Sequence, residues 1–121
     1  MRTFIALELP AEFADDAAAL ARRLSASLEG RFLDRDTYHL TLAFLGDIDD
    51  GEAGRAMDAL DAVCAVAGPI VLAPDGLGKF GRPADATLWL GIAPAPPLMA
   101  LAERLRDELA ARAVPFDPKP F

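Results

Sequence analysis

The sequence predicts a mixed fold of α-helices and β-strands, and three observations support this prediction. Short apolar runs typical of buried strands alternate with stretches in which apolar residues recur every three or four positions, as on one face of a helix. One strand-helix unit occurs twice along the chain. Hydrophobic residues make up 53% of the 121 residues and charged residues 26%, a globular composition that can bury a core within one domain.

The first half of the chain contains two predicted strands, each followed by a predicted helix. Residues 3–9 and residues 38–45 are the two apolar runs. The first helix is expected to end near Gly30. Its apolar face is Phe13, Ala17, Leu20, Leu24 and Leu28. Asp49 and Glu52 have the spacing of a capping box in front of the second helix. The apolar positions of that helix are Met57, Leu60, Val63, Cys64 and Ala67.

The second half is predicted to contain shorter strands and one more helix. Residues 70–73 are a short strand candidate, and residues 87–92 form a longer one. Between them, residues 74–86 are rich in Gly, Pro and Asp, which predicts a loop with a short strand around 77–80. The third helix opens at Pro96-Pro97, and the proline-rich stretch after it is expected to be extended or irregular. The apolar face of this helix is Leu98, Leu101, Leu105 and Leu109.

The residue types exclude several classes of function. Cys64 is the only cysteine, so no internal disulfide can form, which suits a reducing, cytoplasmic compartment. Its apolar helical surroundings predict a buried small hydrophobe rather than a nucleophile. One histidine and one cysteine cannot supply the usual ligand sets, so no metal is expected. No other cofactor is expected either.

Charge and hydropathy narrow the choice of partners. The formal net charge is -7 and the pI is about 4.5, which argues against electrostatic binding along an extended nucleic-acid backbone. Any phosphate group must therefore be bound by a few residues of a local site rather than by the overall charge of the protein. No apolar run approaches the roughly 20 residues that span a bilayer, so no membrane partner is expected. Glu8 and Pro10 interrupt the N-terminal apolar run too early for a signal peptide, which predicts a soluble, unprocessed chain.

The recurring unit begins at Thr3 and again at Thr87. In each copy an apolar strand runs into a proline and then into an amphipathic helix. The copies are offset by 84 residues, from position 3 to position 87. In the first copy the helix leads to the strand that begins at His39. The same offset places a matching strand at position 123, just beyond Phe121.

The strand that begins at His39 contains the residues best suited to chemistry. Side chains alternate across a strand, so residues two apart share a face. Alternation puts Leu40, Leu42 and Phe44 on the core face, and His39, Thr41, Ala43 and Leu45 on the other. His39 and Thr41 would then lie roughly 6 to 7 Å apart, close enough to touch one phosphate. An imidazole can exchange a proton near neutral pH, and a threonine hydroxyl can donate a hydrogen bond to a phosphoryl oxygen. On spacing alone, such a pair is more often a half-exposed surface pair.

Other polar and aromatic residues are weaker candidates. Trp89 is expected to pack in the core, with base stacking at a cleft as the alternative. Tyr38 faces away from the neighbouring histidine by alternation. Three cations could add positive potential near a phosphate: Lys79, Arg82 and Lys119. Asp49 and Asp50 are better explained by helix capping than by acid-base catalysis.

A longer string around His39, residues 38–46, resembles the first signature of the two-histidine phosphoesterases. The similarity is specifically to the bacterial and archaeal RNA 2',3'-cyclic phosphodiesterases, also called 2'-5' RNA ligases. Residues 4–10 look like the opening strand and turn of this family, and the segments 77–80 and 88–91 are similar to its middle section. Pro120-Phe121 looks like the dipeptide that precedes its second signature, another His-x-Thr strand. The resemblance therefore covers essentially the whole chain.

The resemblance implies a bilobal α+β fold with pseudo-twofold symmetry, in which antiparallel sheets line a central cleft and helices pack outside. Each lobe contributes one His-x-Thr strand to that cleft. His39 would take part in proton transfer, with the acid role favoured over the base role, and Thr41 would bind the phosphate. The implied substrates are RNA ends or small cyclic nucleotides, whose 2',3'-cyclic phosphate is opened to a 2'-phosphate. The reverse, RNA-ligase direction stays open.

The chain departs from the family pattern because His39 is its only histidine. The second histidine would follow Pro120-Phe121 by a few residues, close to the position that the repeat gives. Residues 1–121 are therefore expected to be one two-histidine phosphoesterase domain that lacks its C-terminal strand and second motif, and to be nearly inactive alone. The alternative is a naturally single-motif protein. The missing strand would leave a sheet edge uncovered, which would permit self-association.

Two further functions stay open from the sequence. The chain could be a non-catalytic domain that binds nucleotides or phosphate through His39 and Thr41. It could also be an α+β interaction domain with no small-molecule site. Binding without turnover would indicate the first, and neither binding nor turnover the second.

Overall fold

The described part of the chain contains two antiparallel two-stranded sheets and three α-helices. It comprises residues 2–82, 85–119 and 121 of the computed structural model. The strands are β1 (Arg2–Glu8), β2 (His39–Asp47), β3 (Pro74–Arg82) and β4 (Asp85–Ile92); β1 pairs with β2, and β3 pairs with β4. The helices are α1 (Ala11–Ser25), α2 (Asp50–Cys64) and α3 (Pro96–Ala111), and a single 3-10 turn, η1 (Arg35–Thr37), precedes β2. The predicted α+β class is therefore confirmed.

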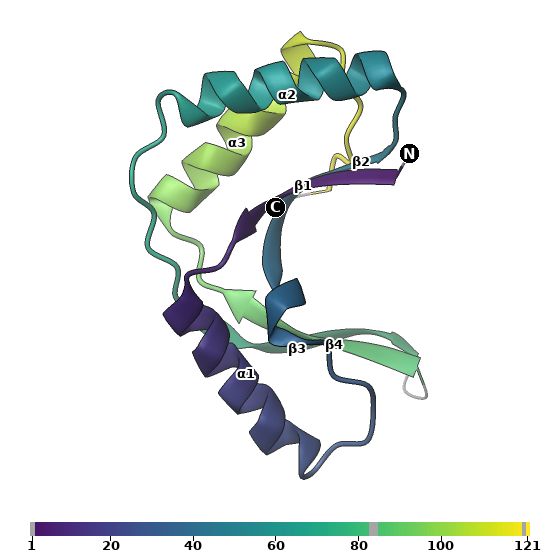
Figure 1. The fold of residues 1–121 in the computed structure, drawn as a ribbon, viewed down its shortest axis with the longest axis vertical. Helices are drawn as coiled ribbons and strands as arrows, with labels where there is room; N and C mark the ends of the chain where they lie inside the picture. The colour runs from purple at the N-terminus through teal and green to yellow at the C-terminus, as the bar shows by residue number, and fades with distance from the viewer. Residues whose placement is uncertain (1, 83–84, 120) are drawn as a thin grey trace.

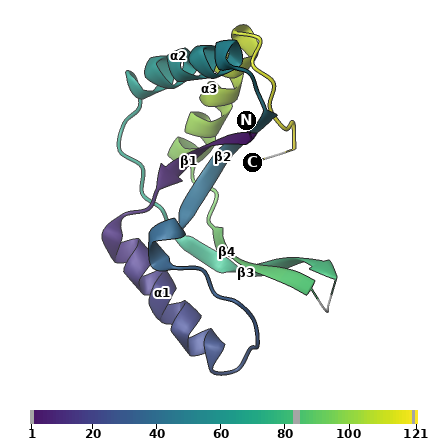
Figure 2. The ribbon, with the colours of Figure 1, turned by 45° about the vertical axis from the view of Figure 1, so that its right-hand side comes forward.

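The elements form an open crescent with two arms (Figure 1). One arm holds the β1–β2 sheet with α2 and α3, which contact each other, and α3 also contacts β2. The other arm holds α1 and the β3–β4 hairpin, and Figure 2 shows the same separation from a second direction. The main core lies in the first arm, where the largest fully buried side chains are Leu98, Leu105, Leu109 and Val63.

Local signals explain where the helices begin and end. The capping box at the start of α2 is confirmed, because Glu52 N donates to Asp49 Oδ1 at 2.7 Å and Asp49 N donates to Glu52 Oε1 at 3.0 Å. Pro96 and Pro97 open α3 as expected. Helix α1 ends at Ser25, earlier than the predicted stop at Gly30, since the chain turns directly after the last helical residue.

The prediction that Cys64 is buried is wrong. Cys64 is the last residue of α2 and is exposed, and Met57, one heptad earlier, is 60% exposed. The buried face of α2 consists of Ala56, Ala59 and Val63. Seven residues are close to two helical turns, so the thiol lies on the same flank as Met57, rotated away from the side that meets the core.

The strand predicted around residues 77–80 is confirmed but is longer than expected, because β3 covers residues 74–82 of the segment predicted mainly as a loop. The predicted strand at residues 70–73 is wrong, since these residues are not in a strand. The glycines are compatible with a hairpin because Gly76 and Gly81 adopt positive φ angles of 68° and 98°, which other residues rarely adopt. Gly78 pairs directly with Trp89, and a Cβ on Gly78 would lie 2.1 Å from the indole ring. The predicted strand at 87–92 is confirmed as part of β4.

A first β-bulge in β2 changes which side chains share a face. Ala6 of β1 pairs with Thr41, but its neighbour Ile5 pairs with Ala43, so the register skips Leu42. Leu42 and Ala43 are consecutive, yet their exposed fractions are only 4% and 1%. Simple alternation placed Ala43 beside the histidine, and the bulge instead turns it toward the core.

A second bulge repeats the effect two residues later. Phe4 pairs with Phe44 and Thr3 pairs with Gly46, so the register skips Leu45. Leu45 is buried with a 5% exposed fraction, whereas Phe44 is 57% exposed. Gly46 has a φ of 73°, a left-handed conformation that glycine adopts at little steric cost. The predicted placement of Phe44 in the core and of Leu45 outside it is therefore wrong.

Candidate functional site

His39 is the first residue of β2, and its ring is fixed from two sides. Nδ1 lies 2.9 Å from the carbonyl oxygen of Thr37. Because a carbonyl oxygen can only accept, Nδ1 carries the proton and donates this hydrogen bond. Phe4 of β1 stacks on the imidazole, with ring centroids 5.0 Å apart and an interplanar angle of 25°. His39 is exposed, so Nε2 is left for exchange of a proton with a bound molecule.

Thr41 lies on the same face of β2 as His39. The pairing of Thr41 with Ala6 and of His39 with Glu8 keeps the predicted two-residue alternation intact, because the first bulge comes only after Thr41. The Thr41 side chain is half-buried and lines a cavity of about 480 Å³, whereas His39 is not among the residues that line it. The structure thus places Thr41 among the residues that line the cavity, and the imidazole of His39 outside the lining on the same face of β2.

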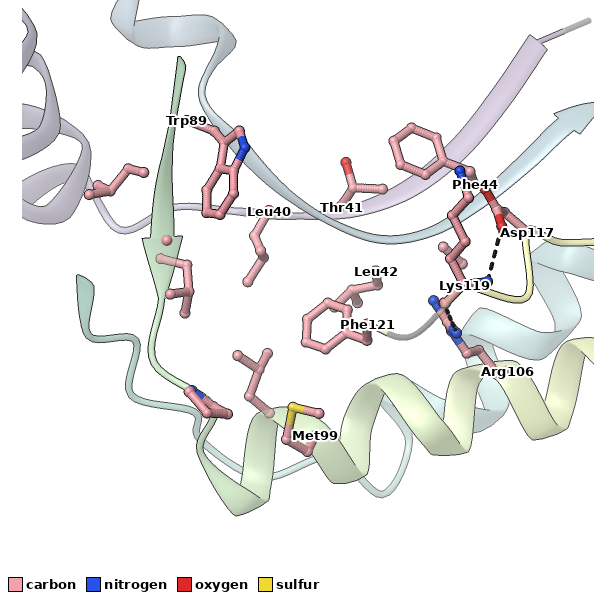
Figure 3. A pocket seen from close by; sticks show the side chains of 16 residues that line it. Leu40, Thr41, Leu42, Phe44, Trp89, Met99, Arg106, Asp117, Lys119 and Phe121 are labelled. Carbon is pink, nitrogen blue, oxygen red and sulfur yellow. Dashed lines mark hydrogen bonds between the residues drawn. The ribbon is translucent and has the colours of Figure 1, made fainter. Parts of the chain in front are cut away.

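The cavity lies between the sheet edges of β2 and β4 (Figure 3). Residues 40–44 of β2 and residues 89–92 of β4 form two of its walls, and α3 forms a third. Within the described residues, β2 pairs only with β1 and β4 only with β3. One hydrogen bond already reaches β2 from the other side, from Asp117 N to the carbonyl oxygen of Phe44 at 2.8 Å. Phe121 also lines the cavity.

Two cations lie at the same cavity. Arg106 Nη1 donates to the carbonyl oxygen of Lys119 at 2.7 Å, and its guanidinium lies 5.7 Å from the centroid of Phe116. Arg106 Nε is buried and has no hydrogen-bond partner among the described residues. Lys119 was predicted from the sequence as a source of positive potential and does line the cavity, beside Asp117. Lys79 and Arg82 lie exposed on β3 and are absent from the lining.

Aromatic residues around the site were misjudged from the sequence. Trp89 was expected in the core, but it is 47% exposed and lines the same cavity as Thr41 (Figure 3). Phe4 is 49% exposed, packs with Phe44 at 6.2 Å between centroids, and shares the face of His39. Only the pairing register could have revealed this group, since a bulge leaves no clear signal in a single sequence.

Comparison with known proteins identifies the family. The model of the LigT-like phosphoesterases matches residues 7–89, which include β2 with His39 and Thr41. This chain belongs to the LigT-like phosphoesterase family. The RNA 2',3'-cyclic phosphodiesterase of Geobacillus stearothermophilus is 33% identical over 120 residues, which are 98% of this chain and 38% of that protein. The Escherichia coli K12 protein of the same name is 31% identical over 121 residues, 99% of this chain and 66% of that protein.

Solved structures of the LigT-like family have the same fold. E. coli LigT in apo form superposes with a TM-score of 0.74 at 27% identity, over 99% of this chain and 66% of that chain. E. coli LigT complexed with 3'-AMP gives a TM-score of 0.59 at 28% identity, over 95% of this chain and 67% of that one. The chain thus spans between 38% and 66% of the curated relatives named above.

Two further findings concern metals and membranes. Among residues 2–82, 85–119 and 121, no three His, Cys, Asp or Glu side chains are grouped so that they could hold a metal ion. None of the helices in this part of the chain has the length and apolar character needed to cross a membrane.

Proposed function

We propose that His39 and Thr41 form one half of a two-histidine site that opens the 2',3'-cyclic phosphate of RNA or oligonucleotide ends to a 2'-phosphate. The observation that supports this proposal most is that His39 and Thr41, two residues apart, lie on the same face of β2. The His39 ring is held through Nδ1, which leaves Nε2 for the substrate. Family membership supports the same chemistry, because the relatives are RNA 2',3'-cyclic phosphodiesterases.

The reaction needs a base on one side of phosphorus and an acid on the other. Water gives up a proton to the base and attacks phosphorus, the bond from phosphorus to the 3' oxygen breaks, and that oxygen takes a proton from the acid. Because Nδ1 donates to the Thr37 carbonyl, Nε2 is the nitrogen that exchanges a proton with the substrate. His39 serves as the acid once Nε2 has taken up a proton, so that both ring nitrogens carry one. The Thr41 hydroxyl donates to a phosphoryl oxygen and stabilises the charge that develops there.

The surroundings of His39 fit a nucleotide better than a free phosphate. Phe4 and Phe44 form an exposed aromatic surface on the same face as the histidine and the threonine. Aromatic side chains stack nucleobases of any sequence, which suits an enzyme that acts on RNA ends. The E. coli LigT complexes with 3'-AMP and with NADP+ support a nucleotide as the bound species.

The second imidazole is proposed to come from a second His-x-Thr strand seated in the cavity between β2 and β4. Among the described residues each of these strands pairs with one other strand only, and residues of both line this space, so an added strand could pair with their second edges. The hydrogen bond from Asp117 to Phe44 begins such a pairing, and Phe121 lies further along the same cavity, beside Leu42 in Figure 3. Such a strand would complete the bilobal, pseudo-twofold arrangement that the resemblance implies.

The test is hydrolysis of 2',3'-cyclic AMP by the product of the complete reading frame. His39→Ala should lower kcat by about 10²- to 10⁴-fold, the usual contribution of a positioned acid or base. Thr41→Val should lower it by about 10²-fold, because one donor to the phosphoryl oxygens is lost. Thr87→Val on exposed β4 is the matched control and should leave the rate unchanged. An unchanged rate in His39→Ala would refute the assignment, and nucleotide binding without turnover would favour a non-catalytic binding domain.

A further inference from the structure

We propose that Arg35 is a positioning residue for His39: it ties the turn η1 to helix α1, and this turn holds the carbonyl group that fixes the histidine ring. Arg35 lies four residues before the histidine and is not among the residues that line the cavity. The proposal rests on the proposed role of His39, but its test reads the state of the imidazole directly and does not require turnover.

The first step is the contact between Arg35 and α1. Arg35 Nε donates to the carboxylate of Asp15, and Nη2 donates to the carbonyl oxygen of Ala11 at 3.2 Å. Nη1 donates to Asp36 Oδ1 at 3.1 Å. The hydrogen bond with Asp15 is the main reason that the pKa of Arg35 lies above its ordinary value, so the guanidinium stays charged. One side chain thus joins the first turns of α1 to a segment 20 residues away in sequence.

The second step runs from Arg35 through η1 to Thr37. Tyr38 N donates to the carbonyl oxygen of Arg35 at 3.1 Å, and Thr37 N donates to that of Asp34 at 3.0 Å. The Thr37 hydroxyl donates to the same Asp34 carbonyl at 2.7 Å. These bonds hold the peptide group whose oxygen accepts from His39 Nδ1 at 2.9 Å. The chain of contacts therefore ends at the nitrogen that sets the tautomer of the ring.

The third step explains why the turn needs a tether. Residues 26–34 between α1 and η1 contain no helix or strand, so no ladder of backbone hydrogen bonds fixes η1 from the N-terminal side. On this side the position of η1 depends on its contact with α1, and Figure 1 shows the single turn beside the helix. A lone exposed ion pair contributes little, but two hydrogen bonds from one planar guanidinium to Asp15 and Ala11 of α1 define an orientation as well as an attraction.

The experiment uses nitrogen-15 NMR of the imidazole, which is unambiguous because His39 is the only histidine. At pH about 8.5 an ordinary imidazole is neutral, and the two nitrogen shifts report which one is protonated. The unaltered chain should hold mainly the Nδ1-protonated form. Arg35→Ala should turn this majority into a minority, and Arg35→Lys should restore it only in part because it lacks the planar fork.

Matched variants separate positioning from general loss of structure. Arg31→Ala, an exposed arginine in the same segment, should leave the tautomer unchanged. Asp15→Ala should act like Arg35→Ala, while Asp15→Asn, which keeps an acceptor, should act weakly. If Arg35→Ala fails to fold, the two Asp15 variants decide the proposal by the same readout. An unchanged tautomer in Arg35→Ala and Asp15→Ala, or an equal change in Arg31→Ala, would overturn it, whatever the diesterase activity of the protein.

Discussion

The same substitution, glycine to alanine, should have opposite effects on stability at Gly46 and at Gly54. Gly46 has a φ of 73° at the second bulge of β2, and a Cβ there would meet nothing within 4 Å. The cost is therefore backbone strain alone, about 1 to 2 kcal/mol for an L-residue held in the left-handed region. Gly54 lies inside α2 and is equally open. Alanine there should stabilise by about 0.5 to 1 kcal/mol, because it removes the entropic cost of a helical glycine.

In urea unfolding followed by circular dichroism, the free energies of unfolding of the two variants should differ by about 2 kcal/mol. Gly54→Ala should be more stable than the unaltered chain, and Gly46→Ala less stable. For a domain of this size the melting temperatures should differ by about 8 °C. Gly46→Asn should lie close to the unaltered chain, since asparagine tolerates the left-handed region. A neutral or stabilising Gly46→Ala would show that the second bulge does not exist as described, and the exposed position of Phe44 would lose its explanation.

Three further predictions concern the cap of α2, the buried core and the exposed thiol. Asp49→Ala should cost about 1 kcal/mol in thermal unfolding because the capping box is lost, whereas Glu52→Gln, which keeps an acceptor, should cost less. Leu105→Ala should cost about 2 to 5 kcal/mol in urea unfolding, since this side chain is 1% exposed, while Met57→Ala at 60% exposure should change stability by less than about 0.5 kcal/mol. Cys64 should react with a thiol reagent in the folded protein at nearly the rate of the urea-unfolded chain, and protection of the thiol would contradict its exposed position.

The periodicity of the sequence predicted where the helices and strands lie better than it predicted which side chains are buried. The three helices and the strands β1, β2 and β4 follow the expected patterns, because amphipathic spacing and caps are local signals. Strand β3 was predicted only as a short strand around residues 77–80 within a loop, since its glycines are typical of loops. Their use in a longer hairpin strand depends on the partner strand, as the pairing of Gly78 with Trp89 shows. Cys64 was misplaced because a helix end can lie outside the buried face even when its sequence stays apolar.

The site was predictable only as far as two-residue alternation holds. His39 and Thr41 share a face because they precede the first bulge. Beyond it the alternation fails twice, which moved Ala43 into the core and Phe44 onto the open face. Cross-strand neighbours such as Phe4 depend on register, and register is set by tertiary pairing rather than by any one segment. The dipeptide expected before the second signature includes Pro120, which lies outside the described residues.

The most direct test of the proposal that His39 and Thr41 form one half of a two-histidine site is the rate of 2',3'-cyclic AMP hydrolysis. It is measured for residues 1–121 alone and for the product of the complete reading frame. The 121-residue chain should show no turnover above buffer, because its single imidazole cannot act as base and acid on both sides of phosphorus. The complete product should release a 2'-phosphate and lose this activity with His39→Ala. Equal turnover by the 121-residue chain would contradict the account, since it would show that His39 and Thr41 need no second histidine.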